Sequence, residues 1–365
     1  MNFYEKELEA LKRAGRFRER KLFSEDLIDL ASNDYLGLAE KYSQFQKAVT
    51  LMEEYQSFAP KASMLVNGYH EIHRHFEETL AELNGFDEGL VVGSGFLANL
   101  SLIESLVRKG DRLFMDAEYH ASGVMASQLL GDRVMFFRHN DANDLLAKLQ
   151  QYGGRRNIIA VEGVYSMSGE LCNRDIFDVA GQKEALLIVD EAHSSGVVGK
   201  NLLGIYEHYG ITVAPNHIKM GTLGKAYGSY GAYILASKEI ISFLVNRAKP
   251  VIYSTAPSVF DTALALVNVK HVAKKAEKYY SKILEHQKLV EEHLGIKTPS
   301  LIVALKQSGN AEVIQLQKKL MKQGFLVGAI RQPTVSQPII RLIPRLGVSS
   351  KHLGKVLKAI VSEAP

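Results

Sequence analysis

The feature that most constrains the fold is a regular alternation of short apolar runs with helix-like segments between about residues 89 and 237. The runs GLVV, DRLFM, RVMFF, NIIAV, LLIV, IKMG and AYILA are short and rich in branched residues, which favours strands over buried helices. Segments of helical period, such as ANLSLIESLVRKG, separate most of them. This pattern predicts a mostly parallel sheet covered by helices on both faces.

The remaining segments frame that sheet. Residues 1–22 are predicted to form a basic helix, followed by the strand-like piece DLIDLAS and the turn NDYLG. Beyond about residue 240, a long helical stretch precedes a smaller α+β unit with the strand candidates LIVALK, FLVGAI and IIRLIP. A chain of 365 residues has room for more than one core. We expect an N-terminal segment (1–40), a large α/β domain (41–245) and a small C-terminal α+β domain (246–365).

Composition excludes several classes of protein. Apolar residues make up 46% and charged residues 23%, and no run approaches the ~18 apolar residues that a membrane span needs. The charged N-terminus lacks the apolar core of a secretory signal. A single cysteine, Cys172, excludes an intramolecular disulfide and a cysteine-based zinc site. Because the net charge of +4 is scattered, nucleic acid is not implied. We expect a soluble cytoplasmic protein without a bound metal.

A glycine turn, residues 93–98 (GSGFLA), follows the first apolar run of the alternation and has the form G-x-G-x-x-A. Glycines at a strand-to-helix turn let backbone N–H groups approach the phosphate of a dinucleotide or of any other ligand. A tight turn needs the same glycines without any ligand. The motif therefore indicates a phosphate site only together with other residues.

A second motif, Asp190-Glu191-Ala192-His193, matches the acidic box of some ATP-driven helicases. Such enzymes also need a G-x-x-x-x-G-K-[ST] loop, and no Gly-Lys pair of this chain is followed by Ser or Thr. What remains is an aspartate at the end of a buried strand, where open α/β sheets bind their ligands. This carboxylate needs a cationic partner, either a structural Arg or Lys or a protonated pyridine nitrogen.

Lys225 follows Asp190 by 35 positions, in the glycine-spaced segment MGTLGKAYGSYGAYIL. Glycines leave room for a bulky adduct, and a semi-buried amine is more readily the neutral nucleophile that forms imines. Taken singly, a lysine in such a loop is usually solvated. Together with Asp190, His193 and the phosphate turn, Lys225 is the candidate for covalent chemistry.

These motifs resemble, in order, those of the α-oxoamine synthases, pyridoxal-phosphate enzymes with the aspartate-aminotransferase fold. Single pieces are moderately specific, whereas their ordered occurrence along nearly the whole chain is strong. The resemblance implies a fold-type I transferase with a mostly parallel large domain, a smaller α+β C-terminal domain and a short N-terminal segment. The matching segments are SNDYLGL (32–38), GSGFLANLS (93–101), DAEYHAS (116–122), EGVYSMSG (162–169), VDEAHSSGVVG (189–199), MGTLGKAYGSYGA (220–232), YSTAPS (253–258) and IRQPTV (330–335) with Arg341.

The resemblance also implies the cofactor and its contacts. Lys225 holds pyridoxal phosphate as a Schiff base, Asp190 pairs with the pyridine nitrogen, and His120 stacks on the ring. In a homodimer with shared sites, the partner subunit supplies two of the phosphate contacts. The further implied contacts are His193 and Ser166 at the ring hydroxyl, Gly95, Phe96 and Thr222 at the phosphate, and Ser254 and Thr255 as the contacts across the dimer.

On the substrate side, Arg341 resembles the arginine that grips the amino-acid carboxylate, since a guanidinium offers two parallel donors. Asn33 resembles an active-site residue, although an Asn-Asp pair before Leu-Gly is equally good turn chemistry. One of Arg16, Arg18 and Arg20 is expected to meet the acyl substrate, and the sequence does not choose between them.

The implied reaction is a decarboxylative condensation of an amino acid with an acyl thioester, begun when the amine of Lys225 removes the Cα proton. Within the family, the chain most resembles the biotin-pathway member, which joins L-alanine to a pimeloyl thioester of coenzyme A or acyl carrier protein. The alternatives are a member that uses glycine and acetyl-CoA and, more remotely, a non-catalytic binding protein with the same fold. The chain departs from the family pattern at residues 59–64, near the expected acyl entrance, and at residues 336–338.

Overall fold

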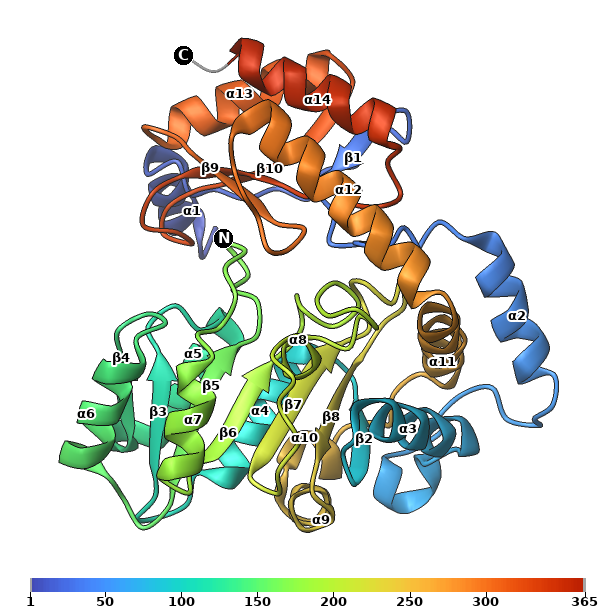
Figure 1. Ribbon diagram of the computed structural model, residues 1–365, viewed down its shortest axis with the longest axis vertical. Coiled ribbons are helices and arrows are strands. Elements are labelled where there is room, and N and C mark those ends of the chain that lie inside the picture. Colours follow the sequence, from blue (N-terminus) through green and yellow to red (C-terminus); the bar gives the residue numbers. More distant parts are fainter. Residues whose placement is uncertain (1, 364–365) are drawn as a thin grey trace.

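The computed structural model describes residues 2–363 and contains two sheets, one of seven strands and one of four. In Figure 1 the seven-stranded sheet fills the lower body, the four-stranded sheet lies above it, and helix α12 (Ala276–Leu294) descends from the upper body toward the lower one. No helix in residues 2–363 is long and apolar enough to cross a membrane.

The large sheet has the strand order β2-β8-β7-β6-β5-β3-β4 and is parallel except for β8, which is antiparallel to both of its neighbours. The predicted mostly parallel sheet is confirmed, since each strand coincides with one of the predicted apolar runs. The strands are β2 (Glu88–Val92), β3 (Arg112–Asp116), β4 (Val134–Phe137), β5 (Asn157–Glu162), β6 (Leu186–Asp190), β7 (His217–Thr222) and β8 (Ala232–Ala236).

The central strands are apolar throughout because both faces of the sheet are covered. Along β5, Ile159 and Val161 pack into one hydrophobic cluster, whereas Ile158 and Ala160 pack into another on the opposite face. Alternate side chains of a strand point to opposite faces, so a strand buried on both sides reads as an unbroken apolar run. The first cluster includes α3 (Glu71–Asn84), α6 (Ala142–Tyr152), α7 (Asp175–Gln182) and α11 (Val259–Lys274), and the second includes α4 (Gly95–Leu106), α5 (Ala121–Ser127), α9 (Lys238–Arg247) and α10 (Lys249–Ile252).

The small sheet combines both ends of the chain. Its order is β1-β10-β11-β9, and β1 (Ile28–Leu30) runs parallel to β10 (Phe325–Ile330). Leu30 joins the hydrophobic cluster of the C-terminal unit. The segment after β1 therefore starts from a fixed point on the small sheet. The other elements of this unit are β9 (Val303–Lys306), β11 (Ile339–Leu342), α12, α13 (Asn310–Lys322) and α14 (Ser350–Glu363).

Several boundaries differ in detail from the sequence reading. The helix predicted over residues 1–22 is only α1 (Glu5–Arg13), which is followed by Gly15 at a φ of 64°, a left-handed backbone conformation that ends helices. The long helical stretch is divided at Lys275 into α11 and α12. Helix α11 packs on α3 and on α2 (Tyr42–Met52), beside the large sheet. The three-part division with boundaries at residues 40 and 245 stays a prediction.

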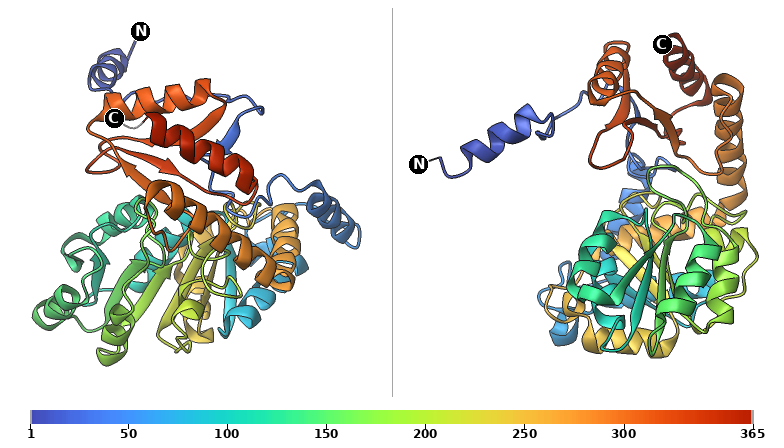
Figure 2. Two further views of the ribbon diagram at one scale, coloured as in Figure 1. Left: turned by 45° about the horizontal axis from the view of Figure 1, so that its top comes forward. Right: turned by 90° about the vertical axis from the view of Figure 1, so that its left-hand side faces the viewer.

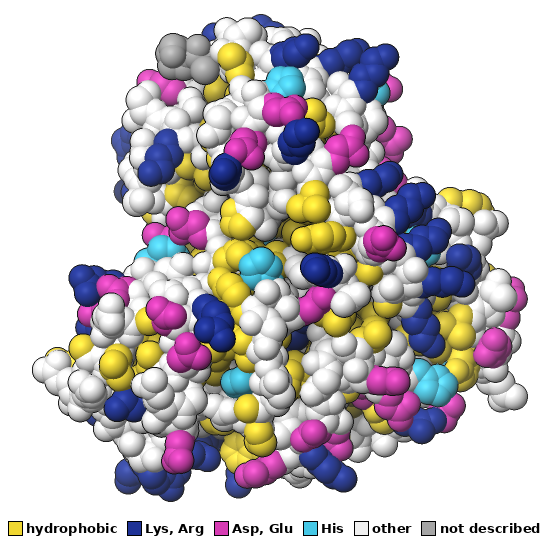
Figure 3. All heavy atoms as spheres, viewed as in Figure 1, with side chains coloured by type: hydrophobic (Ala, Val, Ile, Leu, Met, Phe, Trp, Pro, Cys, Tyr) yellow, Lys and Arg dark blue, Asp and Glu magenta, His cyan; other side chains and the backbone are white. Residues whose placement is uncertain are grey.

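The surface reflects this arrangement. Figure 2 shows α1 standing away from the rest of the molecule, and no residue of α1 is buried. Figure 3 shows apolar side chains gathered between the upper and lower bodies, within a mostly polar face.

The remaining elements are the short helix α8 (Ile205–His208), a π-helical turn η1 (Met64–Gly68) and a 3₁₀ segment η2 (Gln128–Arg133).

Candidate active site

A cavity of about 210 Å³ lies at the carboxyl ends of β5, β6 and β7. This is where an open parallel sheet offers its ligand crevice. It contains seven of the predicted site residues together with five that the sequence did not single out. The predicted ones are Gly95, Phe96, His120, Asp190, His193, Thr222 and Lys225, and the others are Asn99, Ser122, Glu162, Ala192 and Met220.

Asp190, the last residue of β6, is buried and makes no ion pair with any residue in the described part of the chain. One carboxylate oxygen accepts a hydrogen bond from Asn99 Nδ2 at 2.9 Å, and the other accepts from the backbone N–H of Ala192 at 3.0 Å. These two donors fix the orientation of the carboxylate. A buried anion with only neutral partners still needs a cation, and the cavity is where that cation would lie.

A series of hydrogen bonds fixes the ring of His120. Its Nδ1 accepts from the backbone N–H of Ser122 at 3.2 Å, which caps α5, and lies 2.7 Å from Ser122 Oγ. Asn99 Nδ2 donates to the same hydroxyl at 2.9 Å, and Tyr119 donates to Asn99 Oδ1. Burial of its ring lowers the pKa of His120. The imidazole is therefore a neutral ring with a fixed orientation in the wall of the cavity.

Lys225 and His193 touch inside the cavity, with Nζ and Nε2 2.7 Å apart. Desolvation lowers the pKa of Lys225 to about 8, although the carboxylates of Asp190 and Glu162 act in the opposite direction. Desolvation and the positive charge of Lys225 lower the pKa of the fully enclosed His193 well below its ordinary value. A lysine with such a pKa is neutral in a much larger fraction of molecules near physiological pH than an ordinary lysine.

Glu162, at the end of β5, is a second carboxyl group beside Asp190. Burial and the negative charge of Asp190 raise the pKa of Glu162 well above its usual range. Its Oε2 accepts from the backbone N–H of Ser166 at 3.0 Å, while Oε1 is buried without a partner in the described structure. Glu162 thus holds the loop that carries Ser166.

The start of helix α4, which lines the cavity, has the features of a phosphate site. Helix α4 begins at Gly95, and the Ser94 hydroxyl caps it by accepting from the backbone N–H of Leu97 at 3.2 Å. The first N–H groups of a helix have no acceptor within the helix, and the helix dipole favours an anion there. Thr222, from the end of β7, adds a hydroxyl to the same cavity.

Arg341 of β11 reaches the loop after β5 from the small sheet. Its Nε donates to the carbonyl oxygen of Ser166 at 2.8 Å, and its Nη1 donates to Asn33 Oδ1 at 2.9 Å. The remaining Nη2 is buried without a hydrogen-bond partner among the described residues. The structure therefore joins the three predicted residues Ser166, Asn33 and Arg341 and leaves one guanidinium nitrogen free to bind a carboxylate.

Other predicted residues lie elsewhere. Ser254 and Thr255 line a small separate hollow beside the ends of β2 and α10, and they do not line the cavity that holds Lys225. Arg16 and Arg18 line a pocket of about 180 Å³ together with Arg331, whereas Arg20 is outside its lining.

A family model described as aminotransferase class I and II matches residues 25–360. The chain belongs to this family. Among curated relatives, the 8-amino-7-oxononanoate synthase of Helicobacter pylori strain J99 is 45% identical over 98% of this chain and 96% of that protein. The 8-amino-7-oxononanoate synthase of Geotalea daltonii is 36% identical over 94% and 92% of the two chains.

Solved structures of other proteins share the fold of this chain. An 8-amino-7-oxononanoate synthase from Francisella tularensis has a TM-score of 0.76 and 27% identity, covering 93% of this chain and 98% of that one. The serine palmitoyltransferase of Sphingomonas wittichii has a TM-score of 0.88 at 23% identity, covering 100% and 98%. The predicted family and the predicted fold are confirmed.

Pyridoxal phosphate fits the cavity of this family member on three structural grounds. Asp190 is a buried carboxylate that lacks a cation, which a protonated pyridine nitrogen would provide. Lys225 is an amine of lowered pKa. The start of α4 and Thr222 offer backbone N–H groups and a hydroxyl to a phosphate. No cluster of metal-ligating side chains occurs within residues 2–363.

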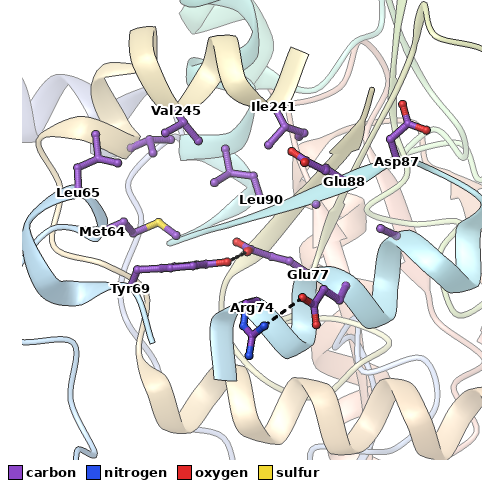
Figure 4. A pocket seen from close by; sticks show the side chains of 14 residues that line it. Met64, Leu65, Tyr69, Arg74, Glu77, Asp87, Glu88, Leu90, Ile241 and Val245 are labelled. Carbon is purple, nitrogen blue, oxygen red and sulfur yellow. Dashed lines mark hydrogen bonds and ion pairs between the residues drawn. The ribbon is translucent and has the colours of Figure 1, made fainter. Parts of the chain in front are cut away.

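A second, larger cavity of about 380 Å³ has a different character (Figure 4). It lies beside β2, between η1, α3 and α9, and it contains none of the predicted site residues. In Figure 4 the Tyr69 hydroxyl points at Glu77, and apolar side chains that include Leu90 and Ile241 form the opposite wall. It is larger than the cavity at Lys225, but the predicted chemical groups converge in the smaller one.

Sequence reasoning missed Tyr35, Asn99, Ser122 and Glu162, which contact the predicted residues directly. Each lies inside one of the segments on which the family resemblance rests. The signal was therefore present in those segments. What the sequence lacked was the spatial contact that turns an ordinary Tyr, Asn, Ser or Glu into a support for a catalytic group.

Proposed function

We propose that this chain is an 8-amino-7-oxononanoate synthase, which condenses L-alanine with a pimeloyl thioester of coenzyme A or acyl carrier protein in biotin biosynthesis. The cofactor is pyridoxal phosphate, and the enzyme acts in the cytoplasm. One observation carries the proposal: Lys225 and the buried Asp190, which forms no ion pair in the described structure, line the same cavity, in a chain 45% identical to a relative of that name.

Pyridoxal phosphate, when bound, supplies an electron sink for the carbanion formed at the amino-acid Cα. The chain provides the rest. Arg341, held by Ser166 and Asn33, presents Nη2 to the alanine carboxylate and so fixes the direction of the Cα–H bond. Lys225 Nζ, with a pKa of about 8, accepts the Cα proton as a general base and can return it.

A pocket of three arginines favours pimeloyl over acetyl as the acyl group. Arg16, Arg18 and Arg331 line it, and Arg18 donates to Thr334 Oγ1 at 3.2 Å. Arg331 follows β10, which pairs with the strand that holds Arg341. A pimeloyl group ends in a carboxylate that guanidinium groups bind, whereas an acetyl group carries no second charge. Of the three N-terminal arginine candidates, we therefore assign Arg16 and Arg18 to the acyl substrate.

The active enzyme is a homodimer with shared sites. Ser254 and Thr255, which resemble phosphate contacts, do not line the Lys225 cavity of their own chain, so the assignment needs them to act on a partner. Nearby apolar side chains stand exposed, as expected of a surface that a second copy covers. They include Leu65, Val66 and Tyr253.

Product formation tests the proposal. Purified protein loaded with pyridoxal phosphate should release carbon dioxide from L-alanine and pimeloyl-CoA and form 8-amino-7-oxononanoate. Lys225→Ala should abolish both this product and the retention of cofactor after borohydride reduction, because no other amine of the cavity can hold it covalently. Turnover by Lys225→Ala would refute the assignment of this residue.

The alternatives give different results in the same assay. A glycine C-acetyltransferase would form product only from glycine and acetyl-CoA. A non-catalytic binding protein would take up the cofactor without turnover of either pair. The buried Nη2 of Arg341 argues against the binding protein, because a carboxylate clamp beside the cofactor site has a use only when an amino acid binds.

A further inference from the structure

Tyr35 lies next to the active site but takes no part in the proposed reaction. Its side chain is fully buried and follows β1 by five residues. The hydroxyl oxygen lies 2.5 Å from His193 Nδ1 and 3.3 Å from Asn33 Oδ1. The aromatic ring also meets the imidazole edge-on, with centroids 6.1 Å apart. One hydroxyl thus bridges a residue of the cofactor cavity and a residue of the carboxylate clamp.

Each neighbour of Tyr35 continues the line of contacts. His193 Nε2 lies 2.7 Å from Lys225 Nζ, and Asn33 Oδ1 accepts from Arg341 Nη1 at 2.9 Å. Five side chains therefore form an unbroken series from the catalytic amine to the substrate clamp. They come from four parts of the chain that are separate in sequence: the segment after β1, the loop after β6, the loop after β7, and β11.

The hydroxyl proton links the two ends because it can be donated in only one direction at a time. When Tyr35 donates to His193 Nδ1, the imidazole carries its proton on Nε2 and donates toward a neutral Lys225 amine. When Tyr35 donates to Asn33, Nδ1 is the protonated nitrogen and Nε2 accepts from an N–H of Lys225. The direction of one hydroxyl thus sets whether the imidazole donates to the catalytic amine or accepts from it.

We propose that Tyr35 is a positioning residue that holds His193 against Lys225 and joins this pair, through Asn33, to the Arg341 clamp. The inference rests on the proposed function, since it concerns the cofactor and the amino acid of that site. It assigns to Tyr35 a coupling between the two: the contact that orients Arg341 for the carboxylate is the same contact that orients the imidazole at the cofactor.

Tyr35→Phe isolates the hydroxyl, because the ring and its packing are retained. A matched control is Tyr209→Phe, which also removes one tyrosine hydrogen bond, from the hydroxyl to the Cys172 carbonyl at 2.7 Å, but lies outside both substrate pockets and the cofactor cavity. Thermal unfolding of the two apoproteins measures the structural cost of losing one hydrogen bond in each.

Two affinities test the coupling. Equilibrium binding of pyridoxal phosphate to the apoprotein and absorbance titration of the loaded protein with L-alanine should each show dissociation constants about tenfold weaker for Tyr35→Phe, the loss expected for one hydrogen bond within a buried polar series. Tyr209→Phe should match the native protein in both. In steady-state assays Tyr35→Phe should raise the KM for alanine and leave the KM for pimeloyl-CoA unchanged.

Three results would overturn the proposal. Affinities of Tyr35→Phe equal to those of the native protein would show that the hydroxyl positions nothing. A loss confined to one of the two ligands would show that cofactor and clamp are not joined through Tyr35. An equal loss in Tyr209→Phe would reduce the effect to stability. If instead the native protein bound no pyridoxal phosphate, the proposed function itself would fall together with this inference.

Discussion

Glu77 shows how strongly burial sets the charge state of a single residue in this molecule. Burial raises the pKa of Glu77 to about 7, although hydrogen bonds from the Tyr69 hydroxyl at 2.5 Å and the Val91 N–H at 2.8 Å act against the rise. In the unfolded chain the carboxyl group ionises near pH 4.5. Between these values the folded protein holds a proton that the unfolded chain releases, so this residue makes stability fall as the pH rises through that window.

Glu77→Gln should remove this pH dependence. The amide oxygen can still accept from Val91 and the amide nitrogen can donate to the Tyr69 oxygen, but no proton is held. The free energy of unfolding of the variant, relative to the native protein, should therefore increase by on the order of 3 kcal/mol between pH 5 and pH 8. Urea unfolding of the apoproteins at both pH values measures it. A difference that stays constant with pH would contradict the raised pKa.

Arg341→Lys should weaken alanine binding selectively. Lysine keeps the charge, but its donors share one nitrogen, whereas the guanidinium places separate nitrogens at Ser166, at Asn33 and toward the carboxylate. We expect the KM for alanine to rise by about tenfold to a hundredfold. Steady-state kinetics with each substrate varied in turn provide the measurement. Arg331→Lys serves as the reciprocal control, because it should raise the KM for pimeloyl-CoA instead; equal effects on both substrates would contradict the two assignments.

The sequence could identify the residues whose side-chain type by itself indicates a chemical role. Lys225 and Asp190 are a nucleophile and a carboxylate placed after buried strands, and the structure brings them into one cavity. Tyr35 and Glu162 could not be found in this way. Their importance arises from contacts with residues far away in the sequence, and a tyrosine or a glutamate after a strand has many ordinary roles.

At the scale of elements, a buried ion pair fastens β7 to the loop that follows β6. Lys219 Nζ lies 3.7 Å from Glu191 Oε1 and donates to Asn84 Oδ1 at 2.8 Å. Glu191 Oε2 accepts from the Ser194 hydroxyl at 2.6 Å and from the backbone N–H of Ile205 at 2.8 Å. The loop between these contacts carries His193, so the pair supports the cavity without lining it.

Lys219→Met should be strongly destabilising. It leaves the buried Glu191 without its cation, and breaking a buried pair from one side costs about 3–5 kcal/mol. Lys288→Met, at an exposed pair with Glu292 in α12, is the control and should change stability by less than about 0.5 kcal/mol. Chemical unfolding of the apoproteins compares them. Similar losses in the two variants would show that burial does not decide the cost.

Whether a segment forms a strand or a helix was predictable where its sequence pattern is local. Which distant strands pair with one another was not predictable. The large-sheet strands appear in the sequence because burial on both faces leaves an uninterrupted apolar run. The parallel pairing of β1 with β10 leaves no such trace, since a three-residue strand has hardly any periodicity. The end of α1 depends on the backbone conformation of Gly15, and the basic residues that follow gave no sign of it.

At the scale of the whole molecule, the exposed apolar side chains near Ser254 and Thr255 give the proposed dimer a direct test. Val66 is 77% exposed, so Val66→Asp removes little packing within one chain. In the dimer it would bury an unpaired charge, which is costly. Sedimentation should show a dimer for the native protein and a monomer with weakened retention of pyridoxal phosphate for the variant.

The control for the dimer is Val361→Asp, which places the same charge on an exposed position of α14. This variant should sediment as the native protein does. A native protein that sediments as a monomer, or a Val66→Asp variant that remains dimeric, would contradict the shared sites.

The parallel pairing of β1 with β10 also bears on how the molecule is made. Ile28 leaves the ribosome about 300 residues before its partner Phe325. Asn33 and Tyr35 come directly after β1, and Arg341 comes after β10. The large sheet can fold during synthesis, whereas the side chains that connect the clamp to Lys225 meet only after β10 and β11 have been made. A chain that stops before Arg341 therefore lacks the substrate clamp, and its amine is not presented with an amino acid.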